Sequence, residues 1–214
     1  MNFTCKAIVF DLDGVLVDSD PIAVRHWQRW AEHHGLPVEP ILAAHHGRPT
    51  VETVRQFAPH LDAVAEAKMK EIAEADDTDG LVAHEGAARL LSTLPPERWT
   101  IATSGTRRTA TFRLQHVGLP IPDDIVTADD VKRGKPAPDP YLLAISRLDL
   151  AVEDCVVIED APSGIMAAKA AGARVIGVAS TNQPAVLADA DAIVAKLSDL
   201  HVELIGNRLK ITTT

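Results

Sequence analysis

The chain of 214 residues is 46% hydrophobic, so it can bury a substantial core as one domain or as a core with a small additional unit. Its 21 basic and 30 acidic residues give a formal net charge of −9 without a basic block, which argues against nucleic-acid or anionic-membrane binding. No apolar run approaches the length that crosses a bilayer, and Met1 leads into a predicted strand rather than a signal peptide. Cys5 and Cys155 are expected to be buried reduced thiols, and no Cys/His spacing suggests zinc. We therefore expect a cytoplasmic protein.

The first predicted core strand, residues 6–11, is an apolar run that ends in Asp11 and Asp13 and is followed at once by Gly14. A run of this length with β-branched members suits a strand that is covered on both faces. The two carboxylates then emerge at the carboxyl end of the strand, where open parallel sheets bind their ligands. Carboxylates this close repel each other, and burial strengthens the repulsion. The pair indicates a bound cation or a shared proton, with a simple capped turn as the alternative.

An all-helical segment follows this strand. Between Pro21 and Val82 there is no strand signal, and apolar residues recur at helical spacing over 22–34 and 62–75. We predict a helical insert over residues 19–80 within a core formed by residues 1–18 and 81–214. Residues 14–19 and 79–80 are the expected hinges.

Strands and helices alternate through the rest of the chain. Four further strands are predicted at residues 99–103, 124–127, 155–159 and 174–179. Four helices are predicted near residues 84–94, 108–117, 140–148 and 163–171. A short strand at 191–194 and a terminal hairpin over 201–211, turning at Gly206-Asn207, complete the chain. The alternation predicts an α/β fold, with a Rossmann-like parallel sheet and helices on both of its faces.

Residues with possible chemical roles follow three of these later segments. Thr103-Ser104-Gly105 ends the second core strand, Lys135 lies in a proline-rich loop, and Glu159-Asp160 ends the strand at 155–159. Together with Asp11 and Asp13, this ordered set resembles the motifs of the haloacid dehalogenase-type phosphohydrolases: Asp-x-Asp, then Thr or Ser, then Lys, then paired acids. The resemblance covers essentially the whole chain, and it implies that the helical insert is a cap over the site.

A narrower resemblance connects the chain to one subgroup of that family. The matching segments are residues 46–48, 103–105, 129–136, 140–142 and 159–165. They are similar to the subgroup that contains sugar-phosphate, 2-deoxyglucose-6-phosphate and glycerol-3-phosphate phosphatases. We therefore expect a phosphatase of small sugar or polyol phosphomonoesters, with a small phosphorylated metabolite as its partner, acting as a monomer or weak homodimer.

The resemblance assigns catalytic roles to individual residues. Asp11 is the expected nucleophile, and it forms an aspartyl-phosphate intermediate. Asp13 is expected to protonate the leaving group and then to deprotonate the attacking water. Lys135 is expected to neutralise the phosphoryl oxygens and the charge on the nucleophile. The Thr103 hydroxyl and the backbone N–H groups of Ser104 and Gly105 are expected to hold phosphoryl oxygens.

Mg²⁺ is the expected cofactor, since it takes hard oxygen ligands. Asp11 and Asp160 are the expected side-chain ligands, and the resemblance implies that Asp13 contributes its backbone carbonyl. Glu159 is either a ligand or an acceptor for a bound water, and the sequence leaves both possibilities open. A helix N-terminal cap is a further role for Glu159-Asp160 that is compatible with either.

Substrate selection is expected to lie in the helical insert. His46, Gly47 and Arg48 follow His45 in a polar turn and are candidate contacts to the leaving group. Arg55 is a further candidate for binding hydroxyl or phosphate groups. The alternative is that these side chains lie exposed on a turn and have no role in substrate binding.

Several other functions remain open from the sequence. A β-phosphoglucomutase-like phosphomutase shares all four motifs, but the mutases carry a cap histidine at the position of Ala23. A phosphoglycolate-type phosphatase differs only in its substrate. The dehalogenase branch lacks the second aspartate, which is present here as Asp13. The non-enzyme alternatives are a phospho-accepting signalling module and a catalytically silent binding protein.

Overall fold

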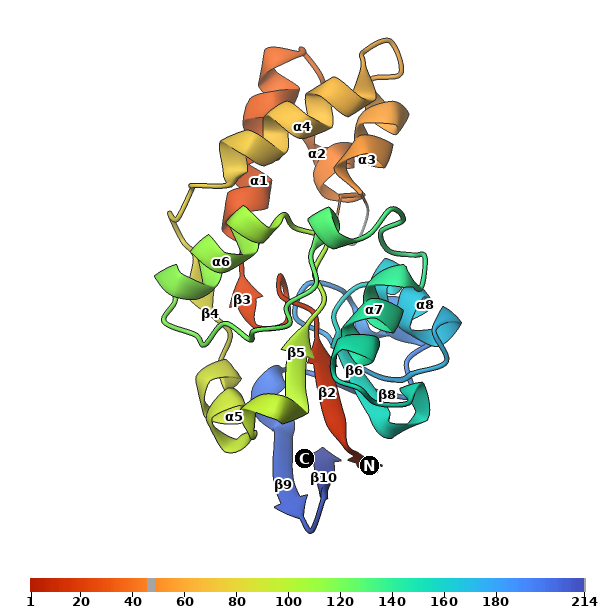
Figure 1. Ribbon diagram of the computed structural model, residues 1–214. Coiled ribbons are helices and arrows are strands. Elements are labelled where there is room, and N and C mark those ends of the chain that lie inside the picture. The colour runs from red at the N-terminus through yellow and green to blue at the C-terminus, as the bar shows by residue number, and fades with distance from the viewer. Residues whose placement is uncertain (46–48, 214) are drawn as a thin grey trace.

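A parallel sheet of five strands forms the centre of the computed structural model, which describes residues 1–45 and 49–213 (Figure 1). Its strands are β2 (Ala7–Phe10), β5 (Trp99–Ile101), β6 (Cys155–Glu159), β7 (Arg174–Val178) and β8 (Ala192–Val194). Their order is β5-β2-β6-β7-β8, and each neighbouring pair is parallel. The predicted α/β class is therefore confirmed. The order places β2 between β5 and β6, so the three predicted polar strand ends are neighbours.

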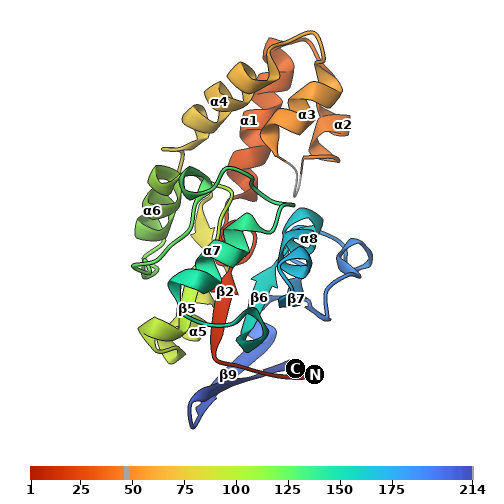
Figure 2. The same ribbon diagram turned by 45° about the vertical axis from the view of Figure 1, so that its right-hand side comes forward.

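Helices cover both faces of this sheet. They are α5 (Ala87–Thr93), α6 (Arg107–His116), α7 (Asp139–Arg147) and α8 (Pro162–Ala170). Ile8 and Phe10 of β2 share one apolar cluster with residues of α5 and α6, whereas Ala7 and Val9 share another with residues of α7 and α8. This follows from the period of two in a strand, which sends alternate side chains to opposite faces. Figure 2 shows α7 and α8 together on one side of the sheet.

Four more helices form a separate bundle beyond the carboxyl ends of β2 and β5 (Figure 1). They are α1 (Asp20–His33), α2 (Val38–Leu42), α3 (Thr50–Phe57) and α4 (Ala63–Glu74). We call residues 20–74 the helical unit. It has an apolar cluster of its own, which includes Trp27, Trp30, Ile41 and Val54. Two short antiparallel strands, β3 (Val17–Asp18) and β4 (Val82–Ala83), join the unit to the sheet, where we predicted only hinges.

The strand predicted at residues 124–127 is wrong. Val126 makes one isolated bridge to Ala102, and its N–H donates to the Ile101 carbonyl at 2.8 Å. The pairing stops there because Thr127 starts a short 3-10 turn, in which the Thr127 hydroxyl and N–H both donate to the Asp130 carboxylate. A capped turn satisfies the backbone groups that a longer ladder would have used.

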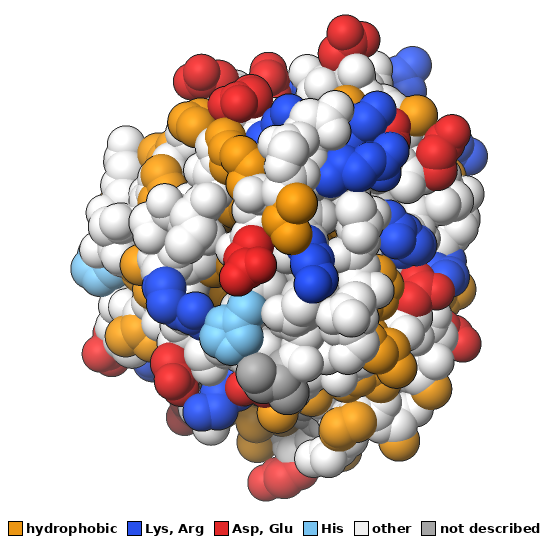
Figure 3. All heavy atoms as spheres, turned by 90° about the horizontal axis from the view of Figure 1, so that it is seen from below, with side chains coloured by type: hydrophobic (Ala, Val, Ile, Leu, Met, Phe, Trp, Pro, Cys, Tyr) orange, Lys and Arg blue, Asp and Glu red, His pale blue; other side chains and the backbone are white. Residues whose placement is uncertain are grey.

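The terminal hairpin is confirmed and has a partner that we did not predict. Its strands are β9 (Leu200–Ile205) and β10 (Arg208–Thr213), and β10 also pairs with β1 (Asn2–Cys5). The strand predicted at residues 6–11 corresponds to β2 in the central sheet, whereas β1, in this small sheet, precedes it and was not among the predicted core strands. Acidic and basic side chains are interspersed on the face that lies opposite the helical unit (Figure 3). Among the described residues, no helix combines the length and the apolarity that a membrane crossing requires.

Candidate active site

Asp11 lies directly after β2, and its N–H donates to the Ile158 carbonyl of β6 at 2.9 Å. This bond holds the Asp11 side chain at the carboxyl edge of the sheet, beside the end of β6. Gly14 completes the turn that follows, with φ of +80°. A Cβ at Gly14 would lie 2.1 Å from an Asp160 carboxylate oxygen, so both the backbone angle and the close approach require glycine here.

Lys135 connects two of the acids. Its Nζ lies 2.8 Å from Asp11 Oδ1 and 2.7 Å from Glu159 Oε1, and its side chain is buried. Burial alone would lower the pKa of the Lys135 ammonium, but the charges of Asp11 and Glu159 outweigh it and raise that pKa. Lys135 therefore stays charged within the site and offsets part of its negative charge.

Glu159 is fully buried and its carboxylate accepts four hydrogen bonds. Oε1 accepts from Lys135 Nζ at 2.7 Å and from the Tyr141 hydroxyl at 2.8 Å. Oε2 accepts from the backbone N–H groups of Asp160 and Ala161, both at 2.9 Å. Since a carboxylate has about four lone-pair sites, this arrangement leaves little capacity for a direct metal bond. Glu159 instead holds Lys135 and the turn after β6 in place.

The space that the Glu159 carboxylate occupies exists only because residue 164 is glycine. A Cβ at Gly164 would lie 1.5 Å from Glu159 Oε1 and 2.0 Å from its Cδ. We expect Gly164→Ala to lower the free energy of unfolding by about 2 kcal/mol or more, because the carboxylate must leave its four donors. Thermal unfolding should show a decrease in Tm of about 5 °C. Gly134→Ala is the control, since no heavy atom lies within 4 Å of its added Cβ. An unchanged Tm for Gly164→Ala would contradict this account of Glu159.

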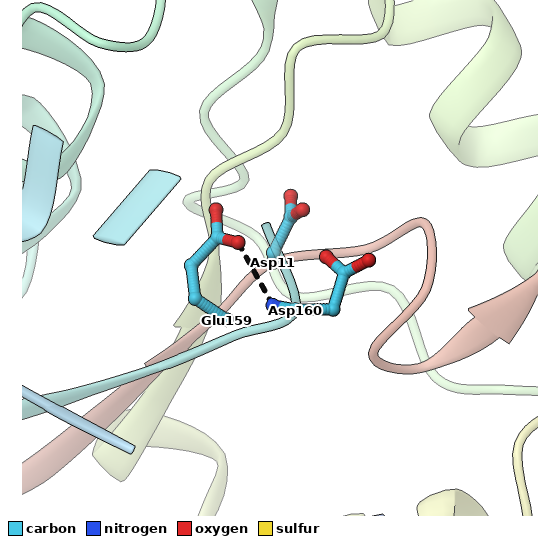
Figure 4. Close-up of side chains that lie close together, drawn as sticks. All are labelled: Asp11, Glu159 and Asp160. Carbon is cyan, nitrogen blue, oxygen red and sulfur yellow. Dashed lines mark hydrogen bonds between the residues drawn. The ribbon is translucent and has the colours of Figure 1, made fainter. Parts of the chain in front are cut away.

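Asp11, Glu159 and Asp160 bring three carboxylates together, with oxygens within 4.8 Å of one another (Figure 4). With all three carboxylates ionised, the single positive charge of Lys135 would leave the cluster with a net charge of −2. Burial is the main cause that raises the pKa of Asp160 well above its usual range, and repulsion from Glu159 and Asp11 is the second cause. Burial also raises the pKa of Asp11 to about 7. The cluster is therefore a place where a divalent cation would restore the balance of charge.

Thr103 is buried next to the end of β5, and its N–H donates to the Val126 carbonyl at 3.0 Å. The Thr103 hydroxyl accepts a bond from the Gly105 N–H at 3.1 Å. Thr103 and Ser104 line the same cavity as Asp11, whereas Gly105 is not among the lining residues. The predicted Gly105 donor is thus engaged with Thr103 in this structure.

The cavity has a volume of ≈ 500 Å³ and lies between the sheet edge and the helical unit. The helical unit contributes lining residues from three segments: Asp20 and Ala23 of α1, His45, and the α3–α4 pair Thr50 and Glu71. The Thr50 hydroxyl hydrogen-bonds to the Glu71 carboxylate, and burial raises the pKa of Glu71.

Not all of the predicted contacts from the insert can be placed. His46, Gly47 and Arg48 lie outside the described residues. Arg55 is exposed on α3 and does not line the cavity, so the structure gives it no place at the site.

Asp13 also lines the cavity, but its carboxylate lies outside the three-carboxylate cluster. Its Oδ1 accepts from the Ser19 hydroxyl at 2.7 Å and from Arg113 Nη1 at 2.5 Å. Arg113 comes from α6, 100 positions away in the chain.

Comparison with known proteins places this geometry in a family. Residues 5–172 match the family model of the haloacid dehalogenase-like hydrolases. The chain belongs to this family. It is 43% identical to hexitol phosphatase A of Escherichia coli over 203 residues, covering 92% of this chain and 94% of that protein. It is 37% identical to glycerol-1-phosphate phosphohydrolase 2 of Saccharomyces cerevisiae, covering 85% and 77% of the two chains. The crystal structure of a hydrolase from Pseudomonas syringae superposes with a TM-score of 0.79 at 29% identity, covering 90% and 94%.

Sequence reasoning named the motif residues of this dehalogenase-like site but missed the side chains that hold them. Tyr141 binds Glu159, and the Thr181 hydroxyl donates to the Asp160 carboxylate. The signal for Thr181 was present in the run of polar residues after β7, at the same sheet edge as the other motifs. The sequence also contained a sign of the role of Arg113. Arg113 lies on the same buried helix face as Ala110 and Leu114, where an apolar residue is usual.

Proposed function

We propose that the protein is a Mg²⁺-dependent phosphatase of small sugar or polyol phosphomonoesters, acting through an aspartyl-phosphate on Asp11. One observation carries the proposal. The buried Asp11 carboxylate faces a cavity of ≈ 500 Å³, with Lys135 Nζ 2.8 Å from one oxygen and two more carboxylates within 4.8 Å. The named activities of the hexitol phosphatase and glycerol-1-phosphate phosphohydrolase relatives support the substrate class.

The reaction has two steps. In the first, an Asp11 oxygen bonds to phosphorus, the bond from phosphorus to the leaving-group oxygen breaks, and Asp13 gives its proton to that oxygen. In the second, Asp13 takes a proton from water, the water oxygen bonds to phosphorus, and the acyl-phosphate bond to Asp11 breaks. Inorganic phosphate leaves and Asp11 is restored. Both steps build negative charge at the phosphoryl oxygens, where Lys135 is the fixed positive charge.

The phosphoryl group would also contact the loop after β5. Thr103 and Ser104 line the cavity next to Asp11, so the Thr103 hydroxyl and the Ser104 N–H remain the proposed donors to phosphoryl oxygens. The Gly105 N–H could donate to a phosphoryl oxygen only if its hydrogen bond to the Thr103 hydroxyl were broken. We therefore assign it a supporting role, in which it orients the Thr103 hydroxyl.

The acidic residues fit Mg²⁺ rather than a softer ion, because every available donor is a hard oxygen. Asp11 and Asp160 would hold the ion through their carboxylates, with the backbone carbonyl of Asp13 as a further ligand. Glu159 would act through Lys135 and the turn after β6, because its four acceptor sites are occupied. Bound Mg²⁺ supplies positive charge that offsets the carboxylates and the incoming phosphate.

We propose that the insert over residues 19–80, which consists of the helical unit and the short segments on either side of it, is the cap that selects the substrate. Thr50 and Glu71 line the cavity from two different helices of the unit, and the oxygens of both side chains can accept hydrogen bonds from the hydroxyl groups of a ligand. A polyol or sugar supplies such donors, and a cavity of this size admits a small metabolite only. His46, Gly47 and Arg48 remain proposed contacts to the same leaving group.

The second candidate is a β-phosphoglucomutase-like activity. The chain is 32% identical to the protein named Beta-phosphoglucomutase of Bacillus subtilis. Ala23, at the position where the mutases carry a cap histidine, lines the cavity and offers only a methyl group. Without that acid–base group, water rather than a sugar hydroxyl is the expected acceptor. A signalling or silent binding module is disfavoured because Asp11, Asp13, Lys135 and Asp160 are all present.

A substrate panel tests the proposal. Hexitol phosphates, glycerol phosphates, 2-deoxyglucose 6-phosphate, phosphoglycolate and β-glucose 1-phosphate would be assayed for phosphate release and for isomerised product. We expect phosphate release from polyol or sugar phosphates with Mg²⁺, loss of activity in excess chelator, and weak activity with Ca²⁺, which relaxes the octahedral geometry. Full activity in chelator would overturn the metal assignment. Isomerised product without phosphate release would favour the mutase, and activity confined to phosphoglycolate would overturn the substrate class.

We also propose a cytoplasmic location and a monomer or weak homodimer. Cys5 and Cys155 are both free and buried, which suits a reducing compartment. Light scattering after size-exclusion chromatography would measure the oligomeric state.

A further inference from the structure

Arg113 is a buried charged side chain whose place in the fold the proposed reaction does not yet explain. It lies on α6, is 8% exposed, and is not among the residues that line the cavity. Its neighbours on the same helix face, Ala110 and Leu114, are fully buried in the apolar cluster under the sheet. Burying a guanidinium costs free energy that burying an apolar side chain at this position would not cost, so the presence of Arg113 here points to a role beyond packing.

Within the described part of the chain, Arg113 forms its ion pair with Asp13, at 2.5 Å. The Arg113 Nε is also buried and has no hydrogen-bond partner among the described residues. The bond from Nη1 therefore fixes the direction of the guanidinium toward Asp13. The Ser19 hydroxyl donates to the same Asp13 oxygen at 2.7 Å, and Ser19 is the residue directly before α1.

These two donors fix the rotamer of Asp13. Both bonds go to Oδ1, and no residue in the described part of the chain donates to Oδ2. The Asp13 side chain is 31% exposed and faces the cavity, so Oδ2 is the oxygen that can meet a leaving group. Arg113 and Ser19 thus hold one carboxylate oxygen and leave the other for chemistry.

We propose that Arg113 is a positioning residue for Asp13. Arg113 does not touch the substrate, but proton delivery from Asp13 to the leaving group depends on it. This inference rests on the proposed function. As the O–H bond of Asp13 breaks and its proton passes to the leaving alkoxide, the carboxylate that forms is already paired with the guanidinium. The pairing also restricts the Asp13 carboxyl group to one rotamer. Proton transfer requires a group that is held within hydrogen-bond distance of the leaving-group oxygen, and this restriction provides it.

Leaving-group chemistry tests this role. An alkyl phosphate releases a strongly basic alkoxide and needs an acid, whereas 2,4-dinitrophenyl phosphate releases a weakly basic phenolate and does not. The parameter to compare is kcat/KM, because it reports the steps through the first phosphoryl transfer and omits the later role of Asp13 as a base. We expect Arg113→Gln to lower kcat/KM for the best polyol phosphate by about 30-fold or more, and for the dinitrophenyl ester by less than about 3-fold.

Two companion variants separate positioning from folding. Arg113→Lys keeps a charge and a donor and should recover part of the loss. Ser19→Ala removes the second donor to Oδ1 without leaving a buried charge unpaired, so it should show the same selectivity even if Arg113→Gln fails to fold. Arg108→Gln is the matched control on the same helix, since Arg108 is 67% exposed and pairs with Asp76. It should leave both substrates within about 2-fold of wild type.

A double-mutant cycle completes the test. In an Asp13→Asn background, Arg113→Gln should cause no further loss on the polyol phosphate, because its effect passes through Asp13. Equal losses on both substrates, or losses that add in that background, would overturn the positioning role. If wild-type protein hydrolyses no alkyl phosphate at all, the proposed function fails instead, so the two failures are distinguishable.

Discussion

Asp11→Asn should abolish turnover while preserving the fold. The amide is nearly isosteric with the carboxylate but cannot form the acyl-phosphate bond, so kcat should fall by about 10³-fold or more. Loss of one charge from the buried cluster also relieves repulsion on an incoming anion, so inorganic phosphate should bind at least as tightly as to wild type. The measurements are steady-state turnover, Tm, and phosphate affinity by calorimetry.

The control for this variant is Asp149→Asn. Asp149 is exposed and has φ of +54°, a conformation that asparagine also tolerates, so activity and Tm should not change. Mass spectrometry would exclude deamidation of the introduced asparagine. Near wild-type turnover by the intact Asp11→Asn protein would show that another group is the nucleophile.

Lys135→Ala is the variant with the second largest expected effect. It removes the ammonium that lies 2.8 Å from Asp11 and 2.7 Å from Glu159, and it leaves two buried carboxylates without their counter-charge. We expect the free energy of unfolding to fall by about 3–5 kcal/mol. We also expect kcat/KM to fall by about 10²-fold or more on every substrate, aryl and polyol phosphates alike, because Lys135 acts on the common phosphoryl group.

The uniformity of this loss is what separates Lys135 from Arg113, for which the loss should depend on the leaving group. Arg133→Ala is the matched control in the same loop, since Arg133 is 72% exposed and pairs with Asp139. It should change kcat/KM by less than about 2-fold. A loss for Lys135→Ala that appeared only with polyol phosphates would contradict its assignment to the phosphoryl group.

Local patterns in the sequence determined the core strands and the position of the acids. An apolar run of strand length, cut off by Asp11 and Asp13, specifies where β2 ends, and the same holds for Glu159 at the end of β6. A parallel sheet brings the carboxyl ends of its strands to one edge, so the sequence alone predicts that these residues lie near one another. The terminal hairpin was equally local, because Gly206 supplies the turn.

The strand ends that depended on competing contacts were not predictable in this way. Val126 has the composition of a strand residue, but Thr127 and Asp130 form a capped turn that ends the pairing after one bridge. Likewise, nothing in the spacing of residues 1–11 shows that β1 leaves the central sheet to pair with β10, which lies at the other end of the chain.

Only the tertiary structure decided which side chains hold the acids. Whether the Glu159 Oε1 atom has lone pairs available for a metal depends on whether Lys135 and Tyr141 donate hydrogen bonds to it. The sequence does not show these contacts, so it left the role of Glu159 open. Asp13 meets Arg113 across 100 positions of chain because α6 packs its buried face against the sheet. Motif residues follow from patterns a few residues long, whereas their partners follow from how helices and strands pack, and that packing is a property of the whole folded chain.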